Sequence, residues 1–265
     1  MRRDNRSERA NGLLASLLVA PLLLQPALVI ASVLWARYES VVRHPDLAAA
    51  NPPTISRAIV DPAIGDPFAI LMLVCFVMLL YSLWRIGGAL YRPTQPPRVK
   101  ALLMVFISCE TVAAAGMVVL SQYTGAVSDS LHQLGSYMLF FGHGIGIPLS
   151  GIFVAIDRTS IDASLAGTAG RPPLPYYSRL HPRLALGVGL CALAFCGLYF
   201  GWEQVKRIDN YSARVVFSMV ELVLLIVFEG YAASFAPPMF RYESYRLCGS
   251  GRPLSIQESA VTSAE

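Results

Sequence analysis

Six long apolar runs, almost free of charged side chains, constrain the fold of this chain more than any other feature. They cover residues 13–35, 67–84, 101–123, 131–156, 184–202 and 215–240. An α-helix of about 20 apolar residues crosses a bilayer core about 30 Å thick, so each run is long enough to span a membrane. Of all residues, 55% are hydrophobic and only 14% are charged, too apolar a composition for a water-soluble fold. The sequence therefore predicts an all-α polytopic membrane protein, a bundle of six transmembrane helices.

Positive charges fall unevenly on the two sides that six spans define. If the N-terminus lies inside, the inner segments carry 15 of the 21 Lys and Arg residues and the outer segments carry 6. Lys and Arg concentrate in cytoplasmic loops, so we expect both termini in the cytoplasm. Residues 1–12 then form a basic N-terminus, residues 13–242 the six-helix domain and residues 243–265 a disordered tail. The net charge of +4 reflects this topology, and no nucleic-acid partner is expected.

The first apolar run has two interpretations. Four arginines precede it, as in a cleaved secretory signal, but it is longer than the apolar part of such a signal, and Pro21, Gln25 and Pro26 interrupt it. We therefore expect a retained helix and an integral multi-pass protein. Its membrane would be that of the Golgi, endoplasmic reticulum or lysosome in a eukaryote, or the plasma membrane in a bacterium.

Few titratable side chains lie inside the predicted spans. Each is a functional candidate, because a charge at membrane depth costs several kcal/mol. Glu110 and His143 fall at about the same depth on neighbouring helices, so we expect a hydrogen bond or ion pair between them. This pair either fixes helix packing or lines a pocket. Glu229, nearer the inner side, is expected to be structural.

Three candidate catalytic residues face the predicted outer side. His132 lies at the outer edge of the fourth span, Glu221 about 10 Å below the outer edge of the sixth, and Ser56 in the proline-rich first outer loop. A serine, an imidazole base and an orienting carboxylate are the groups of a nucleophilic triad, although their spacing does not establish contact. Two His and two Glu spread over about 15 to 20 Å of depth do not converge on one ion, so no metal site is predicted. The sequence identifies no cofactor.

Alternating glycines surround His143 in the fourth span, at Gly142, Gly144 and Gly146. Glycines inside a span allow two helices to approach closely. They also permit local unwinding, here before Pro148. The sequence is compatible with both arrangements.

Four short motifs follow one another along the chain. They are Pro53-Thr54-Ile55-Ser56 before the second span, Ser128-Asp129-Ser130-Leu131-His132 at the start of the fourth, Gly142-His143 within it and Ser218-Met219-Val220-Glu221 in the sixth. In these motifs the chain resembles the FRAG/DRAM/SFK family of six-span membrane proteins, which includes damage-regulated autophagy modulators and GPI-anchor lipid-remodelling proteins. Leu222 departs from the aromatic residue that commonly follows the glutamate in that family. The resemblance extends over roughly residues 13–242.

The resemblance implies a part in membrane lipid metabolism or distribution. In the GPI branch that part is exchange of acyl chains on the lipid anchor, with a polar pocket near the outer or lumenal leaflet. The expected partners are membrane lipids, a GPI-anchored lipid substrate or other membrane proteins, and the motifs leave open whether the protein is itself an enzyme. A non-enzymatic regulator of lipid distribution or autophagy is the first alternative. A proton-coupled transporter is the second, because stacked Glu and His residues can relay protons.

Overall fold

The computed structural model describes residues 5–165, 180–207 and 211–248. Those residues form ten α-helices and no strands. The helices are α1 Asn5–Val19, α2 Pro21–Arg43, α3 Pro45–Ala50, α4 Ile55–Ala58, α5 Pro62–Leu90, α6 Pro97–Gln122, α7 Asp129–Leu165, α8 Leu180–Arg207, α9 Tyr211–Ala233 and α10 Ala236–Cys248. Six helical spans among them are long and apolar enough to cross a membrane, which confirms the predicted all-α bundle of six spans.

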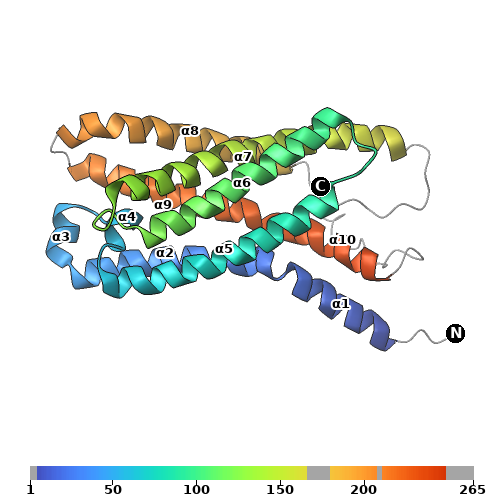
Figure 1. Ribbon diagram of the computed structural model, residues 1–265, viewed down its shortest axis with the longest axis horizontal. Helices are drawn as coiled ribbons and strands as arrows, with labels where there is room; N and C mark the ends of the chain where they lie inside the picture. The colour runs from blue at the N-terminus through green and yellow to red at the C-terminus, as the bar shows by residue number, and fades with distance from the viewer. Residues whose placement is uncertain (1–4, 166–179, 208–210, 249–265) are drawn as a thin grey trace, which may run out of the picture.

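The long helices run side by side along the longest axis of the molecule (Figure 1). The short helices α3 and α4 lie at one end, which we term the outer end, and α1 and α10 lie at the opposite, inner end. The first and last described segments are thus at the same end, as an even number of spans requires. Each long helix from α5 to α9 packs against the next in the chain, and α2 contacts both α5 and α9. The first span therefore closes the bundle between the second and the sixth.

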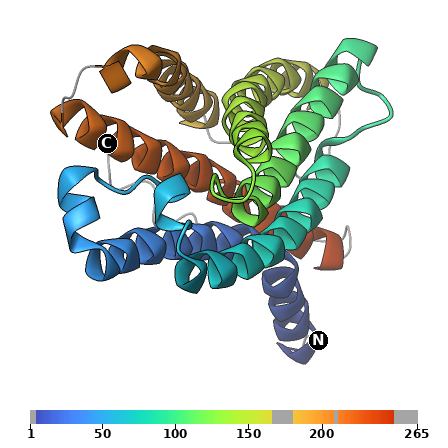
Figure 2. The same ribbon diagram turned by 60° about the vertical axis from the view of Figure 1, so that its left-hand side comes forward.

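The first span lies later in the chain than the apolar run predicts. α2 begins at Pro21, whose ring nitrogen has no hydrogen to donate to the preceding turn, so the helix is interrupted there. The span covers Pro21–Arg43, whereas residues 13–19 belong to α1, which points away from the bundle and packs against α10 (Figure 2). Arg37 and Arg43 are consequently part of a span, where the sequence predicts an outer loop.

The sixth span continues into a helix at the inner end. α10 follows α9 after a short turn and runs to Cys248, so the segment expected to begin a disordered tail at residue 243 is helical as far as it is described. Glu243 is 2% exposed and forms ion pairs with Arg85 of α5 and with Arg246. These pairs tie α10 to the bundle. The rest of the predicted tail, residues 249–265, lies outside the described residues.

Small residues bring α6 and α7 into close contact. A side-chain carbon added at Gly142 of α7 would lie 2.7 Å from Ala113 Cβ and 2.8 Å from Cys109 O, both of α6. Glycine permits this approach because it has no side chain to separate the two backbones. α7 also runs through Pro148 as one helix. The glycines of the fourth span therefore serve close helix contact and do not unwind the helix.

Candidate functional site

Two side chains of α9 hold the loop between α2 and α5 against the bundle. Ser218 Oγ donates a hydrogen bond to Pro53 O at 2.8 Å, and Glu221 Oε2 accepts one from the Ile55 backbone N–H at 3.1 Å. Both side chains are buried. Because Ser218 and Glu221 are three residues apart, they lie on the same face of α9. This face fixes the proline-rich segment over the outer end of the bundle.

Two arginines accompany the Glu221 carboxylate. Arg37 of α2 is 8% exposed and donates to the Ser218 carbonyl oxygen at 3.1 Å. Arg57 of α4 donates to Asn51 Oδ1 at 2.5 Å. Both guanidinium groups interact favourably with the Glu221 carboxylate. We refer to Arg37, Arg57, Ser218 and Glu221 as the outer cluster.

The outer cluster has an excess of positive charge. Burial lowers the pKa of Arg57, the Glu221 carboxylate raises it, and the positive charge of Arg214 lowers it. An arginine pKa begins so far above neutrality that the guanidinium stays charged despite such shifts. Within the cluster, the one carboxylate of Glu221 therefore stands against the two guanidinium groups of Arg37 and Arg57. A bound anion would restore the balance.

Two pockets flank Pro53 at the outer end. The first, of about 500 Å³, lies between the end of α2, α3, α4 and the start of α5, and Arg57 lines it among both apolar and polar neighbours. The second, of about 530 Å³, lies between α2, α3 and α9, and its walls include Arg37, Tyr38 and Met219. We refer to them as the Arg57 pocket and the Arg37 pocket. Each combines a guanidinium group with apolar walls, the composition of a site for an amphipathic ligand.

A contact between His44 and Asp61 closes the rim of the Arg57 pocket. His44 Nε2 lies 3.1 Å from Asp61 Oδ2, and Asp61 Oδ1 accepts a hydrogen bond from the Ala63 N–H at 3.0 Å at the start of α5. The Ala63 hydrogen bond, and after it the bond to His44, lower the pKa of Asp61. The pair joins the end of α2 to the start of α5.

Hydrogen bonds do not join the three predicted catalytic residues in the described part of the chain. Ser56 is half-buried on α4 and is not among the residues that line the two pockets. His132 Nδ1 donates to Tyr123 O at 2.9 Å, since a carbonyl oxygen can only accept, and this bond ties the start of α7 to the end of α6. Glu221 instead accepts from the Ile55 backbone. The structure thus places Glu221 in the outer cluster without forming a Ser56, His132 and Glu221 triad.

A second polar group lies where four helices meet inside the bundle. His143 Nδ1 of α7 lies 2.9 Å from Glu110 Oε2 of α6, so the expected contact between them is present. Gln25 Nε2 of α2 donates to Glu229 Oε2 of α9 at 3.0 Å. Glu229 also interacts electrostatically with His143 and Glu110. We refer to Gln25, Glu110, His143 and Glu229 as the central cluster.

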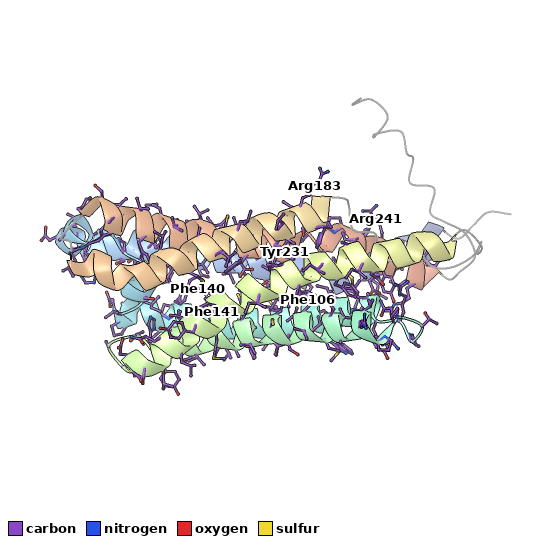
Figure 3. All side chains as sticks on the ribbon, turned by 90° about the horizontal axis from the view of Figure 1, so that it is seen from above. Phe106, Phe140, Phe141, Arg183, Tyr231 and Arg241 are labelled. Atoms are coloured by element: carbon purple, nitrogen blue, oxygen red, sulfur yellow. The ribbon has the colours of Figure 1, made fainter. Side chains whose placement is uncertain are left out.

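Aromatic side chains enclose the central cluster. The rings of His143 and Phe228 have centroids 4.8 Å apart, and Phe228 in turn packs against Phe140. Phe140, Phe106 and Tyr231 lie along the middle of the bundle (Figure 3). Such surroundings have a low effective dielectric constant, in which charges interact more strongly than at a surface.

The residues that the sequence predicts as candidates inside the spans are thus separated and do not form one site. Glu221 belongs to the outer cluster, Glu110, His143 and Glu229 belong to the central cluster, and His132 lies apart from both. Within the described ranges, no three His, Cys, Asp or Glu side chains are arranged to hold a metal ion.

Two residues of α2, Arg37 and Gln25, were not among the predicted site residues. The apolar run ends at Trp35, which puts Arg37 in a loop, and Gln25 reads only as an interruption of that run. The spacing of polar and apolar residues in α2 nevertheless indicates that Arg37 and Gln25 are buried. The buried positions of α2 recur every three or four residues from Leu22 to Ser40, the spacing of one helix face, and both polar residues fall on it.

The outer and central clusters are the two buried polar groups from which a function can be inferred. Comparisons of the chain with protein-family models, with curated proteins and with solved structures find no match, so the resemblance to the FRAG/DRAM/SFK family has no support beyond the motifs themselves.

Proposed function

We propose that the protein binds the head group of an anionic membrane lipid at its outer end and takes part in the handling or remodelling of that lipid. One observation carries the proposal: Arg37 is buried near the outer end of a membrane span and lines a mostly apolar pocket. A guanidinium group has five N–H donors. Within the described residues, Arg37 donates one hydrogen bond, to Ser218 O, which leaves donors for a ligand in the pocket.

The charge of the outer cluster favours a phosphate group. The guanidinium fork matches the oxygens of a phosphate and can form two parallel hydrogen bonds with it. Arg37 and Arg57 stand against the single carboxylate of Glu221, so an anion between or beside them lowers the electrostatic energy of the cluster. A zwitterionic head group carries a positive charge beside its phosphate, so it is attracted less strongly by the excess positive charge of the outer cluster.

The walls of the Arg37 pocket favour a lipid over a free anion. Tyr38, Val41 and Met219 line this pocket, and all three are also exposed on the outside of the spans. In a membrane that outer surface contacts acyl chains. A phospholipid can therefore place its phosphate at Arg37 while its acyl chains stay beside α2 and α9 in the bilayer.

Glu221 has a positioning role in this proposal. Its carboxylate accepts the Ile55 N–H, holds the loop that separates the two pockets and keeps both guanidinium groups at the outer end. The proposal includes no acyl-transfer step, because in the part of the chain that the structure describes no hydrogen bond joins Ser56 to His132 or His132 to Glu221. GPI-anchor acyl-chain remodelling is the narrower form of the proposal, and it rests on the sequence motifs alone.

A binding measurement tests the proposal. Purified protein in mild detergent is titrated with phosphatidylglycerol or phosphatidylcholine, and the dissociation constants are compared for wild type, Arg37→Gln and Arg57→Gln. Loss of a charge-assisted hydrogen bond weakens binding by about 1.5–3 kcal/mol, roughly ten- to a hundredfold, so Arg37→Gln should lose most of the preference for phosphatidylglycerol.

Arg43→Gln is the matched control for that measurement. Arg43 is an exposed arginine one to two turns further along α2, it pairs with Glu39, and it is not among the residues lining the two pockets. Its loss should leave the preference unchanged. Equal weakening in Arg43→Gln and Arg37→Gln would show that the surface potential, and not the outer cluster, attracts the lipid.

Lipid mass spectrometry of cells with and without the gene separates handling from regulation. A selective change in the acyl chains of one lipid class, restored by wild type and not by Arg37→Gln, supports remodelling. Altered distribution between the leaflets at constant composition supports the regulator.

A further inference from the structure

The central cluster contains more acidic groups than it has basic partners. It has two carboxyl groups, Glu110 and Glu229, one imidazole, His143, and one amide, Gln25. All four side chains are buried, with exposed fractions between 2% and 7%. In the described part of the chain, neither carboxyl group forms an ion pair with a Lys or Arg side chain.

The remaining titratable neighbours do not supply a positive charge. Cys75 of α5 interacts with Glu229, and Cys109 of α6 and Tyr231 of α9 interact with Glu110. Thiol and phenol groups are neutral or negative, so they cannot offset a carboxylate. The Tyr231 hydroxyl is itself engaged with Ser150 Oγ at 2.5 Å. His181 of α8 packs on Tyr231, with ring centroids 4.8 Å apart, but it is not among the groups that interact with the two glutamates. Among the described residues that do interact with them, His143 is therefore the one that can carry a positive charge.

Neutrality of this site requires two protons on three groups. One imidazolium offsets one carboxylate, and a second unpaired carboxylate in an apolar interior has a desolvation penalty of several kcal/mol. The second carboxyl group avoids the penalty by taking up a proton. Glu110 Oε1 is fully buried, lies against Gly146 and has no hydrogen-bond partner among the described residues, so an oxygen is available to accept it.

From this arrangement we infer that the central cluster is a proton-binding site inside the membrane, in which Glu110 and Glu229 share one exchangeable proton while His143 offsets the other charge. Uptake of the proton takes the cluster from a net charge of −1 to neutrality. The ligand is a proton, because the described residues offer no third converging ligand for a metal ion.

This site is separate from the lipid site proposed at the outer end. Leu224, Leu225 and Phe228 are buried on α9 between Glu221 and Glu229 and form an apolar layer between the two clusters. A variant that abolishes lipid binding at Arg37 should therefore leave proton binding at Glu229 intact, and a variant that abolishes proton binding should leave lipid binding intact.

Infrared difference spectroscopy of the purified protein tests the inference. A protonated carboxyl group has a C=O stretching band that a carboxylate lacks. Wild type should show this band at neutral pH and lose it as the pH is raised. Glu110→Gln and Glu229→Gln should each abolish the contribution of the central cluster to the band, because either variant leaves a balanced pair of one carboxylate and one imidazolium. His143→Gln should increase it about twofold, because both carboxyl groups then remain protonated.

Glu221→Gln is the matched control, because it removes the other buried glutamate of α9 from the spectrum. A titrating band should persist in Glu221→Gln, and it should disappear when Glu110→Gln or Glu229→Gln is added to that variant. Labelling of wild type with dicyclohexylcarbodiimide, which reacts with protonated carboxyl groups in apolar surroundings, requires no variant and should give an adduct on Glu110 or Glu229. The inference is overturned if wild type has no titrating band, if the band survives when Glu110→Gln or Glu229→Gln is combined with Glu221→Gln, if Glu221→Gln alone removes it, or if the adduct is found on neither Glu110 nor Glu229.

Discussion

Glu221 and Glu229 are both buried glutamates of α9, separated by eight residues or about 12 Å of helix, yet their surroundings differ in kind. Glu221 faces two guanidinium groups and a backbone N–H from the outer loop. Glu229 faces an amide, an imidazole and a second carboxyl group. The first environment supplies two positive groups for one carboxyl group, whereas the second supplies one basic group for two carboxyl groups and favours a shared proton. The neighbours of a buried glutamate, more than its depth, decide which role it can have.

The largest expected loss of folding stability comes from removing the Glu221 carboxylate. Glu221→Gln removes the carboxylate that accepts the Ile55 N–H and interacts with Arg37 and Arg57, and loss of a hydrogen bond to a charged group costs about 1.5–3 kcal/mol. Glu229→Gln replaces one of the two carboxyl groups that share a proton with a neutral group of the same shape and leaves one carboxylate beside one imidazolium, so its effect should be within about 1 kcal/mol. Thermal unfolding of both variants in one detergent measures the difference. Equal losses of stability would remove the distinction between the two clusters.

A smaller loss of folding stability is expected from a substitution that pushes α6 and α7 apart. Gly142→Ala puts a methyl group against Ala113 and the Cys109 carbonyl, and such overpacking costs about 1–3 kcal/mol. It should also weaken the contact between Glu110 and His143 without changing lipid binding at the outer cluster. Gly187→Ala in α8 is the matched control, because open space surrounds Gly187. The variant should match or slightly exceed the wild-type melting temperature, and a loss as large as that of Gly142→Ala would rule out close packing as the cause.

The contribution of the Arg57 pocket rim to the melting temperature should depend weakly on pH. The pKa of Asp61 is lowered in the folded protein, so the carboxylate contributes stability above its ordinary pKa of about 4 and loses that contribution as the pH falls through the lower, folded value. Asp61→Asn should have a lower melting temperature than wild type near pH 6, and the gap should narrow as the pH falls below about 4. A gap that does not change with pH would mean that the Asp61 charge has no part in the stability of the rim.

The smallest effect on lipid binding and on the cellular lipid phenotype is expected from substitution of Ser56. Because Ser56 is not among the residues that line the two pockets, Ser56→Ala should keep nearly all phosphatidylglycerol binding and most of the cellular lipid phenotype. A nucleophilic serine would lose almost all activity on the same change. Lipid mass spectrometry of cells that express Ser56→Ala at the wild-type level decides between these outcomes. Complete loss would restore the catalytic interpretation of Ser56, His132 and Glu221.

The sequence predicts the spans better than the sites. Apolar length is sufficient to identify six spans, and a short connection between the third and fourth places Glu110 and His143 at the same depth. Pro21 shifts the first span because it interrupts the helix within the apolar run, a local backbone effect that run length does not detect.

Partners from distant segments were harder to predict. Gln25 meets Glu229 across 204 positions, and Ile55 meets Glu221 across 166. Which helix faces which is decided by packing of the whole bundle, and depth along a helix does not contain that information. His132 illustrates the same point, because equal depth with the outer loop does not bring it to Glu221, and its ring is bonded to Tyr123.

Photo-crosslinking with a photoactivatable anionic phospholipid tests the central claim most directly. Among the described residues, the arginines of the outer cluster and the ion-paired Arg85 and Arg92 at the inner end could both attract such a lipid. After cross-linking in vesicles, mass spectrometry locates the adducts on the chain. The lipid site proposed here predicts adducts on the segment 37–53 and near Met219, reduced severalfold in Arg37→Gln and unchanged in Arg43→Gln. Adducts confined to the inner end, or adducts at 37–53 that Arg37→Gln leaves unchanged, would contradict a lipid site at the outer cluster.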